Sequence, residues 1–125
     1  MNQLQSKEDY LERILMLSKK LEVVHAIDIA KSMGFSKPSV SIALKKLKEH
    51  DHIEVHDDGS ITLTESGVRI ATRIYERHTV IKELFMLLGV EETIAEKDAC
   101  DVEHEISDVT FEALKVELQR KKAGK

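Results

Sequence analysis

The sequence has little cysteine, proline or aromatic side chain, and each shortage argues against a class of protein. Its 125 residues include one cysteine, one proline, three phenylalanines, two tyrosines and no tryptophan. A single cysteine excludes an internal disulfide framework, so we expect a reduced, cytoplasmic setting. Five aromatic residues are few for a surface that stacks single-stranded nucleic acid. Without a proline-rich linker, the chain fits one compact domain or two small ones.

Long apolar runs are also lacking. The longest obvious one, Phe85 to Val90, is far shorter than the ~20 residues that span a bilayer. The first ten residues include Lys7, Glu8 and Asp9 and lack the apolar core of a signal sequence. We therefore expect no membrane partner.

The net charge of −4 conceals an uneven distribution. Residues 1–75 hold 11 basic and 11 acidic side chains, whereas residues 76–125 hold 8 and 12. The segment from Ser36 to Lys48 contains four lysines and no acid. A phosphate would meet this local positive charge and not the average charge of the chain.

Apolar spacings of three and four predict helices in the first half of the chain. One amphipathic helix is expected over residues 8–21, with Ser6 as its N-cap, and a shorter one over residues 28–33. Gly34 then provides the left-handed stop, and Ser36 can cap the next helix. Two short helices joined through Gly34 form a helix-turn-helix candidate.

After this candidate the apolar period changes to two, which predicts a β-hairpin over residues 53–63. Asp58-Gly59 suits a two-residue turn, because this pair tolerates positive backbone angles. Further helices are expected over residues 64–88, 91–107 and 110–122. The fold class is thus mainly α with a small β-hairpin.

A helix-turn-helix followed directly by a hairpin is the order of a winged helix domain, whose second helix enters the DNA major groove. The outward positions of that helix are hydroxyls and lysines, which suit phosphate and shallow base contacts. The competing interpretation is a unit that merely packs, with its lysines solvated. The predicted DNA-binding residues are Ser36, Lys37, Pro38, Ser39, Ser41, Ile42, Lys45 and Lys46.

A second constellation lies in the acidic half. Cys100, Glu103 and His104 are three and four residues apart and would share one helix face. Thiolate, carboxylate and imidazole on one face form a mixed site for a divalent metal that lacks only ligands from another segment. Asp9 and Glu12 on the first helix could supply them.

His78 on the long helix is a further candidate imidazole ligand. Each candidate also has a plainer explanation. Cys100 alone fits a small core residue, and Asp9 lies three residues after Ser6, where an acid completes a capping box. Glu12 alone fits a solvated helix position.

Taken together, these residues resemble the diphtheria toxin repressor family of metal-dependent transcriptional regulators, including its shorter manganese-regulator branch. The resemblance extends over nearly the whole chain, and it implies an N-terminal winged helix-turn-helix DNA-binding domain over residues 1–70. A C-terminal helical dimerisation and metal-binding domain would follow over residues 71–125. The segments that carry it are residues 6–12, 36–41 and 63–67, Arg77-His78, Asp98-Ala99-Cys100 and Glu103-His104.

The family resemblance implies a homodimer that binds palindromic double-stranded operators when loaded with Fe²⁺ or Mn²⁺ and controls metal homeostasis genes. The metal would couple the first helix to the dimerisation domain. The matching positions for a primary metal site are Asp9, Cys100, Glu103 and His104, and those for a neighbouring second metal are Glu12 and His78.

Some positions depart from either branch. Asp9 and Glu12 match the manganese regulators, whereas Cys100 matches the iron regulators. Lys82 and Glu96 stand where iron regulators use a second-site Glu and His, and an ammonium cannot ligate a cation. A thiolate favours Fe²⁺, Co²⁺ or Zn²⁺ over Mn²⁺, so Zn²⁺, Co²⁺ or Ni²⁺ could bind in vitro.

A surplus of apolar residues supports the dimer: Ile70, Ile74, Ile81, Leu84, Leu87 and Leu88 on the long helix, with Ile94, Val102, Ile106, Phe111 and Leu114 beyond it. No zinc-protease motif, phosphate-binding glycine loop or serine elbow occurs, so we expect neither an enzyme nor a small organic substrate. The alternatives are a thiol-based redox repressor that uses Cys100 and a metal-independent winged-helix factor.

Overall fold

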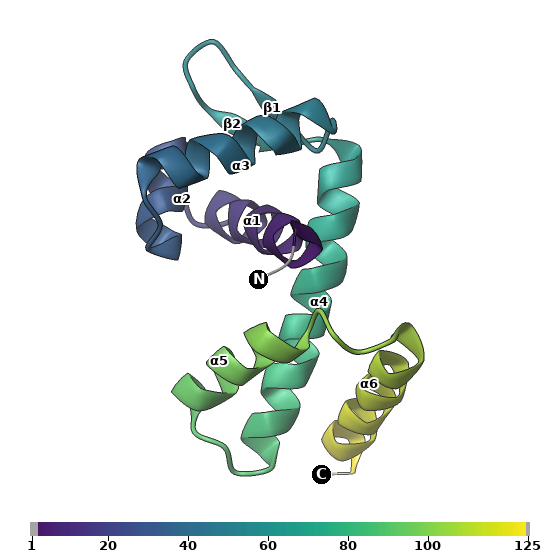
Figure 1. The fold of residues 1–125 in the computed structure, drawn as a ribbon. Coiled ribbons are helices and arrows are strands. Elements are labelled where there is room, and N and C mark those ends of the chain that lie inside the picture. Colours follow the sequence, from purple (N-terminus) through teal and green to yellow (C-terminus); the bar gives the residue numbers. More distant parts are fainter. Residues whose placement is uncertain (1–2, 125) are drawn as a thin grey trace. The chain divides into compact units, whose positions relative to one another are not determined.

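The computed structural model describes residues 3–124, with side chains from residue 6 onward, and confirms a mainly α fold with one small hairpin. The chain forms two compact units, Met1–Arg73 and Ile74–Lys125. Its elements (Figure 1) are α1 (Gln3–Ser18), α2 (Ala26–Met33), α3 (Lys37–Glu49), β1 (Ile53–Val55), β2 (Ile61–Leu63), α4 (Glu65–Leu87), α5 (Glu92–Val102) and α6 (Asp108–Ala123).

The helix-turn-helix of the first unit forms as predicted. Gly34, at φ +72°, ends α2 in the left-handed conformation that glycine adopts without steric cost. Ser36 then caps α3, because its Oγ accepts a hydrogen bond from the Ser39 backbone N–H at 3.3 Å. The apolar faces of α1, α2 and α3 pack around Leu11, Ile29 and other buried residues, which fixes the orientation of α3 within this unit.

The predicted bounds of the first helix were wrong. Helix α1 begins at Gln3 and ends at Ser18, so Ser6 lies inside the helix and is not its N-cap. Residues 19–23 then form a turn and bends, and Val24 forms an antiparallel bridge with Ile61, whose N–H donates to the Val24 carbonyl at 2.8 Å. With no cap at Ser6, the capping-box explanation of Asp9 no longer holds.

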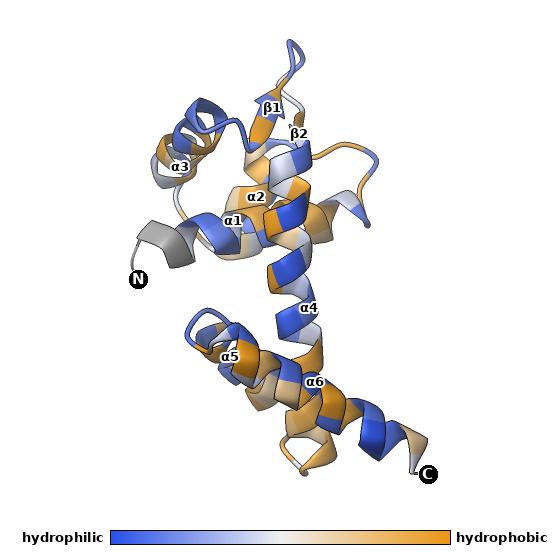
Figure 2. Cartoon of the chain, turned by 90° about the vertical axis from the view of Figure 1, so that its right-hand side faces the viewer, coloured by the Kyte–Doolittle hydropathy of each residue, from blue (hydrophilic) through white to orange (hydrophobic). Residues whose placement is uncertain are grey.

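The hairpin is confirmed, but its two-residue turn is not. Strands β1 and β2 pair antiparallel with Ile53 opposite Leu63, and the backbone N–H of His56 continues the ladder to the Ser60 carbonyl at 2.9 Å. Only Gly59 (φ +86°) takes a positive backbone angle in the loop. The Asp58 carboxylate instead accepts hydrogen bonds from the Ser60 N–H and Oγ, at 2.9 and 2.6 Å. The loop is hydrophilic at its tip (Figure 2).

Gly67 lets the start of α4 pack against the segment that follows α3. A Cβ at this position would lie 2.0 Å from the His52 carbonyl oxygen. We expect Gly67→Ala to lower the free energy of unfolding by about 3 kcal/mol, because backbone must move to relieve the overlap. Gly34→Ala is the control: its Cβ would meet open space, so only the left-handed strain remains, about 1 kcal/mol. Equal urea midpoints for the two variants would contradict this expectation.

In the second unit, two predicted helix bounds were also wrong. Helix α5 stops at Val102 and not at residue 107, and α6 begins at Asp108. Ser107 is recruited as the N-cap of α6, where its Oγ accepts from the Thr110 N–H at 3.2 Å. Glu103 therefore occupies the C-cap of α5.

Several residues predicted to supply the dimer surface are instead buried within one chain. Ile74, Ile81 and Leu84 are at most 6% exposed, and Phe111 packs with Val80 in the core of this unit. The number of apolar residues in the sequence does not show which of them are buried when α5 and α6 pack against α4. The large apolar side chains that stay exposed in the second unit are Met86, Leu87, Leu88, Ile94, Val109 and Val116. No helix among the described residues is long and apolar enough to cross a membrane.

Candidate metal centre and nucleic-acid interface

Three of the predicted ligands converge within the second unit. Helix α4 supplies His78, α5 supplies Cys100, and its C-cap supplies Glu103. The His78 Nδ1 atom lies 2.8 Å from Glu103 Oε1 and 3.7 Å from Cys100 Sγ. One ligand atom from each of the three residues lies within 4.8 Å of the others, so a single ion could contact all three.

Glu103 supplies the carboxylate of this three-residue cluster, and that carboxylate is shielded from water. The residue is fully buried, and its Oε2 atom receives no hydrogen bond from the described residues. Burying a carboxylate oxygen without a hydrogen-bond donor is unfavourable, because the oxygen loses its hydration. A divalent cation next to this oxygen would compensate for the lost hydration. Imidazole, thiolate and carboxylate together are a normal donor set for a transition metal. The residues present therefore fit such an ion.

His78 holds a proton tightly in this setting. Burial by itself lowers the pKa of an imidazole, but hydrogen bonds to Cys100 and Glu103, the charge of Glu103 and a hydrogen bond to Glu96 outweigh it. These contacts raise the pKa of His78 to about 11. At neutral pH the ring is an imidazolium between two carboxylates, with Nε2 at 2.9 Å from Glu96 Oε2.

The remaining predicted ligands lie outside this three-residue cluster. His104 follows the end of α5, with its Nε2 atom 3.4 Å from Glu103 Oε2. Asp9 and Glu12 lie in the other unit, one turn apart on α1, where Glu12 is buried and Asp9 partly buried. Cys100 and Glu103 thus lie close together, whereas His104 lies past the end of α5.

Arg77 is a residue of this centre whose role the sequence reasoning missed. Its side chain is buried, and Nη1 donates hydrogen bonds to the carbonyls of Glu103 and Ile106, at 3.0 and 2.6 Å. Its Nη2 pairs with Asp108, and the guanidinium lies 5.3 Å from the Phe111 ring centre. Arg77 therefore holds the connection between α5 and α6, where Glu103 lies. The sequence does not indicate this role, because an Arg next to a His is not by itself a sign of burial or of contact with a distant turn.

All eight predicted DNA-binding residues are exposed on or beside the N-terminal three turns of α3. Val40, Leu44 and Leu47 face the core instead. Ile42 is 61% exposed, an apolar side chain on an otherwise polar and cationic face. This face can offer lysines to phosphates and short side chains to base edges.

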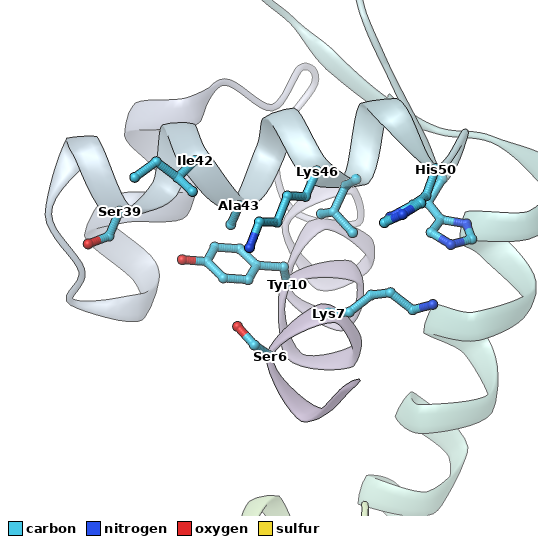
Figure 3. A pocket seen from close by; sticks show the side chains of 10 residues that line it. Ser6, Lys7, Tyr10, Ser39, Ile42, Ala43, Lys46 and His50 are labelled. Atoms are coloured by element: carbon cyan, nitrogen blue, oxygen red, sulfur yellow. The ribbon is translucent and has the colours of Figure 1, made fainter. Parts of the chain in front are cut away.

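A cavity of about 760 Å³ adjoins that face, between α1 and α3. In Figure 3, Ser6, Lys7 and Tyr10 approach it from α1, and Lys46 extends over the Tyr10 ring from α3. His50 and His52 line the same cavity. Local sequence patterns do not predict this cavity, because its lining comes from α1, α3 and the segment that follows α3, which are separate in sequence.

Comparisons with known proteins agree with the two-part organisation. Residues 4–61 match the family described as iron dependent repressor, N-terminal DNA binding domain. Residues 64–122 match the family described as iron dependent repressor, metal binding and dimerisation domain.

Relatives of known sequence cover most of the chain. It is 35% identical to an uncharacterized HTH-type transcriptional regulator of Methanocaldococcus jannaschii, over 93% of this chain and 94% of that one. It is 32% identical to the transcriptional regulator MntR of Escherichia coli, over 90% of this chain and 73% of that one.

Solved structures similar to this chain are also transcriptional regulators. The manganese regulator SloR superimposes with a TM-score of 0.81 at 33% identity, over 90% of this chain and 53% of that one. A manganese-dependent transcriptional repressor in complex with manganese gives 0.83 at 27% identity, over 90% and 52%. This chain thus spans about half the length of those two proteins.

Proposed function

The chain belongs to the iron-dependent repressor family of metal-dependent transcriptional regulators, and from this we propose how it works. It represses metal homeostasis genes as a homodimer that binds a palindromic operator when loaded with Mn²⁺ or Fe²⁺. Residues 1–70 contact DNA, and residues 71–125 bind metal and dimerise. The buried, incompletely hydrogen-bonded carboxylate of Glu103 beside His78 and Cys100 is the observation that carries the proposal.

In this proposal six side chains hold the metal: Asp9, Glu12, His78, Cys100, Glu103 and His104. A bound divalent cation supplies positive charge and joins carboxylates that otherwise repel one another. Asp9 and Glu12 provide this link from α1, and Glu103 provides it from the end of α5. The link restricts how the winged domains are oriented. The two α3 helices of a dimer then match major grooves about 34 Å apart.

The dimer is supported by apolar side chains that one chain leaves exposed. Leu88, Ile94 and Val109 of the second unit are 69%, 52% and 81% exposed, and α5 and α6 show hydrophobic segments among hydrophilic ones (Figure 2). A second copy would remove this surface from water, which is favourable at roughly 25 cal/mol per Å².

The choice of metal depends mainly on Cys100. Its partly buried sulfur favours Fe²⁺, Co²⁺ or Zn²⁺ over Mn²⁺, whereas carboxylates and imidazoles accept all four. Zn²⁺, Co²⁺ and Ni²⁺ then bind in vitro without being the physiological signal. We propose that the metal available in the cell, Mn²⁺ or Fe²⁺, decides which one regulates the protein.

The direct test is DNA binding with and without metal. A duplex is first selected from a random library in the presence of Mn²⁺. Binding to it is then measured with Mn²⁺, with anaerobic Fe²⁺ and with chelator. We expect metal to tighten DNA binding about 5- to 150-fold, and DNA to tighten metal binding by the same factor. Equal affinity in chelator would support a metal-independent factor and contradict the proposal.

Metal uptake is also expected to release protons and to strengthen with pH. A metal binds neutral imidazole, whereas the raised pKa of His78, about 11, keeps the free site protonated at neutral pH. Raising the pH lowers the cost of removing that proton, so the Mn²⁺ affinity rises. Calorimetry in two buffers of different ionisation enthalpy measures the protons released. A Mn²⁺ affinity that does not change between about pH 6 and pH 8 would contradict this expectation.

A further inference from the structure

Two side chains beside the metal cluster form a fixed pair that reaches His78. Lys82 lies one turn after His78 on α4, and Glu96 lies one turn before Cys100 on α5. Lys82 Nζ lies 3.0 Å from Glu96 Oε1, which joins the two helices one turn away from the contact between His78 and Cys100. Lys82 Nζ also lies 3.4 Å from Glu92 Oε2.

The Glu96 carboxylate uses a different oxygen for each neighbour. Oε1 accepts from Lys82, and Oε2 lies 2.9 Å from His78 Nε2. Cys100 Sγ lies 3.9 Å from the same Oε2 atom. With both oxygens engaged, Glu96 is held in one orientation although it is 42% exposed.

This arrangement affects how His78 can bind a metal. A neutral imidazole carries its proton on one nitrogen, and a carboxylate at Nε2 favours the proton there. The Nδ1 lone pair is then left on the side of Cys100 and Glu103. Without Glu96, the proton could occupy either nitrogen. An imidazole with its proton on Nδ1 could not bind the metal through that atom.

We propose that Glu96, anchored by Lys82, is a positioning residue that makes His78 an Nδ1 ligand; this inference rests on the proposed function. Glu96 does not itself bind a cation, because the Lys82 ammonium already takes one of its oxygens. A metal ion placed there would meet a fixed positive charge, which repels it strongly at such distances.

The test uses the full chain with Zn²⁺ and compares Glu96→Ala, Glu96→Gln and Lys82→Met with the wild type. Asp101→Asn is the matched control, since it removes an exposed carboxylate from the same helix, where Asp101 pairs only with Lys97 among the ion pairs described. NMR of isotopically labelled imidazole in the Zn²⁺-loaded protein identifies which nitrogen of His78 keeps its proton. Competition with a chromophoric chelator gives the Zn²⁺ affinity and the number of ions bound.

We expect the wild type and Asp101→Asn to bind Zn²⁺ equally, with His78 protonated at Nε2. Glu96→Ala should bind about 10- to 100-fold more weakly at unchanged stoichiometry, as loss of a carboxylate behind a ligating His does elsewhere. Glu96→Gln keeps an acceptor for Nε2–H and should recover part of the affinity. Lys82→Met leaves Glu96 unanchored and should weaken binding less than Glu96→Ala.

Four results would overturn the inference. Unchanged affinity and an unchanged protonated nitrogen in Glu96→Ala would remove the positioning role. A lower number of bound ions would make Glu96 a ligand. If Glu96→Ala does not fold, unchanged affinity in both Glu96→Gln and Lys82→Met decides against it. A wild type that binds no metal refutes the proposed function, and this inference with it, whereas the first two results refute the inference alone.

Discussion

Glu103→Gln is expected to abolish metal-activated DNA binding and leave a folded protein. The amide keeps the size of the side chain and can still hydrogen-bond to His78, but it removes the charge that a cation would neutralise. Structural metal sites contribute about 10–16 kcal/mol over a few ligands. The loss of one ligand therefore costs roughly 2–3 kcal/mol, on the order of 100-fold in Mn²⁺ affinity. His104→Ala should act in the same direction.

Fluorescence anisotropy with the selected duplex, titrated with Mn²⁺, measures this effect. Asp101→Asn again serves as the control, because it makes the same chemical change at an exposed site on α5. Thermal unfolding adds a second readout, since a bound metal raises the midpoint of the wild type but not that of Glu103→Gln. If Glu103→Gln bound the duplex with an unchanged requirement for Mn²⁺, the proposed metal centre would be wrong.

Arg77→Met is expected to destabilise the second unit strongly, because the side chain is buried and holds the α5–α6 connection. The variant keeps an apolar side chain of similar length but leaves the carbonyls of Glu103 and Ile106 without their donor. Hydrogen bonds from a charged donor contribute about 1.5–3 kcal/mol each, so we expect a loss of at least about 3 kcal/mol. Metal affinity should fall as well, because the turn that carries Glu103 loosens.

Urea unfolding at one fixed protein concentration measures this loss, since a dimer's stability depends on concentration. The control is Arg120→Met, where the side chain is 76% exposed and contacts Glu117 on the same helix. An exposed pair contributes less than about 1 kcal/mol. If Arg77→Met and Arg120→Met had the same urea midpoint, Arg77 would not be holding the α5–α6 connection.

The sequence predicted well those features that depend on neighbouring residues. Gly34 and Ser36 define the turn before α3, and the change of apolar period from 3.6 to 2 defines the hairpin. Backbone conformation and helix capping act over a few residues, so local pattern suffices. The same reasoning failed for the bounds of α1, and it did not predict the bridge between Val24 and the distant Ile61.

Residue type and spacing identified the candidate ligands, but they did not predict which side chains contact those ligands. Sequence gave no sign that His78 contacts Glu96 through one nitrogen and Glu103 through the other. Lys82 was noted as unable to ligate, whereas its contact with Glu96 came only from the packing of α4 against α5. Pairs of this kind join residues 14 to 25 positions apart, which no helical repeat relates.

By itself, then, the sequence determined the order of helices and strands, the exposed cationic face of α3 and which side chains could ligate a metal, because these follow from local conformation and side-chain chemistry. The tertiary structure decided where α5 ends, which residues bury Glu103 and which hydrogen bonds surround His78. Those features arise where helices meet, and the free energy of burying a charged group depends on every neighbour that packing brings to it.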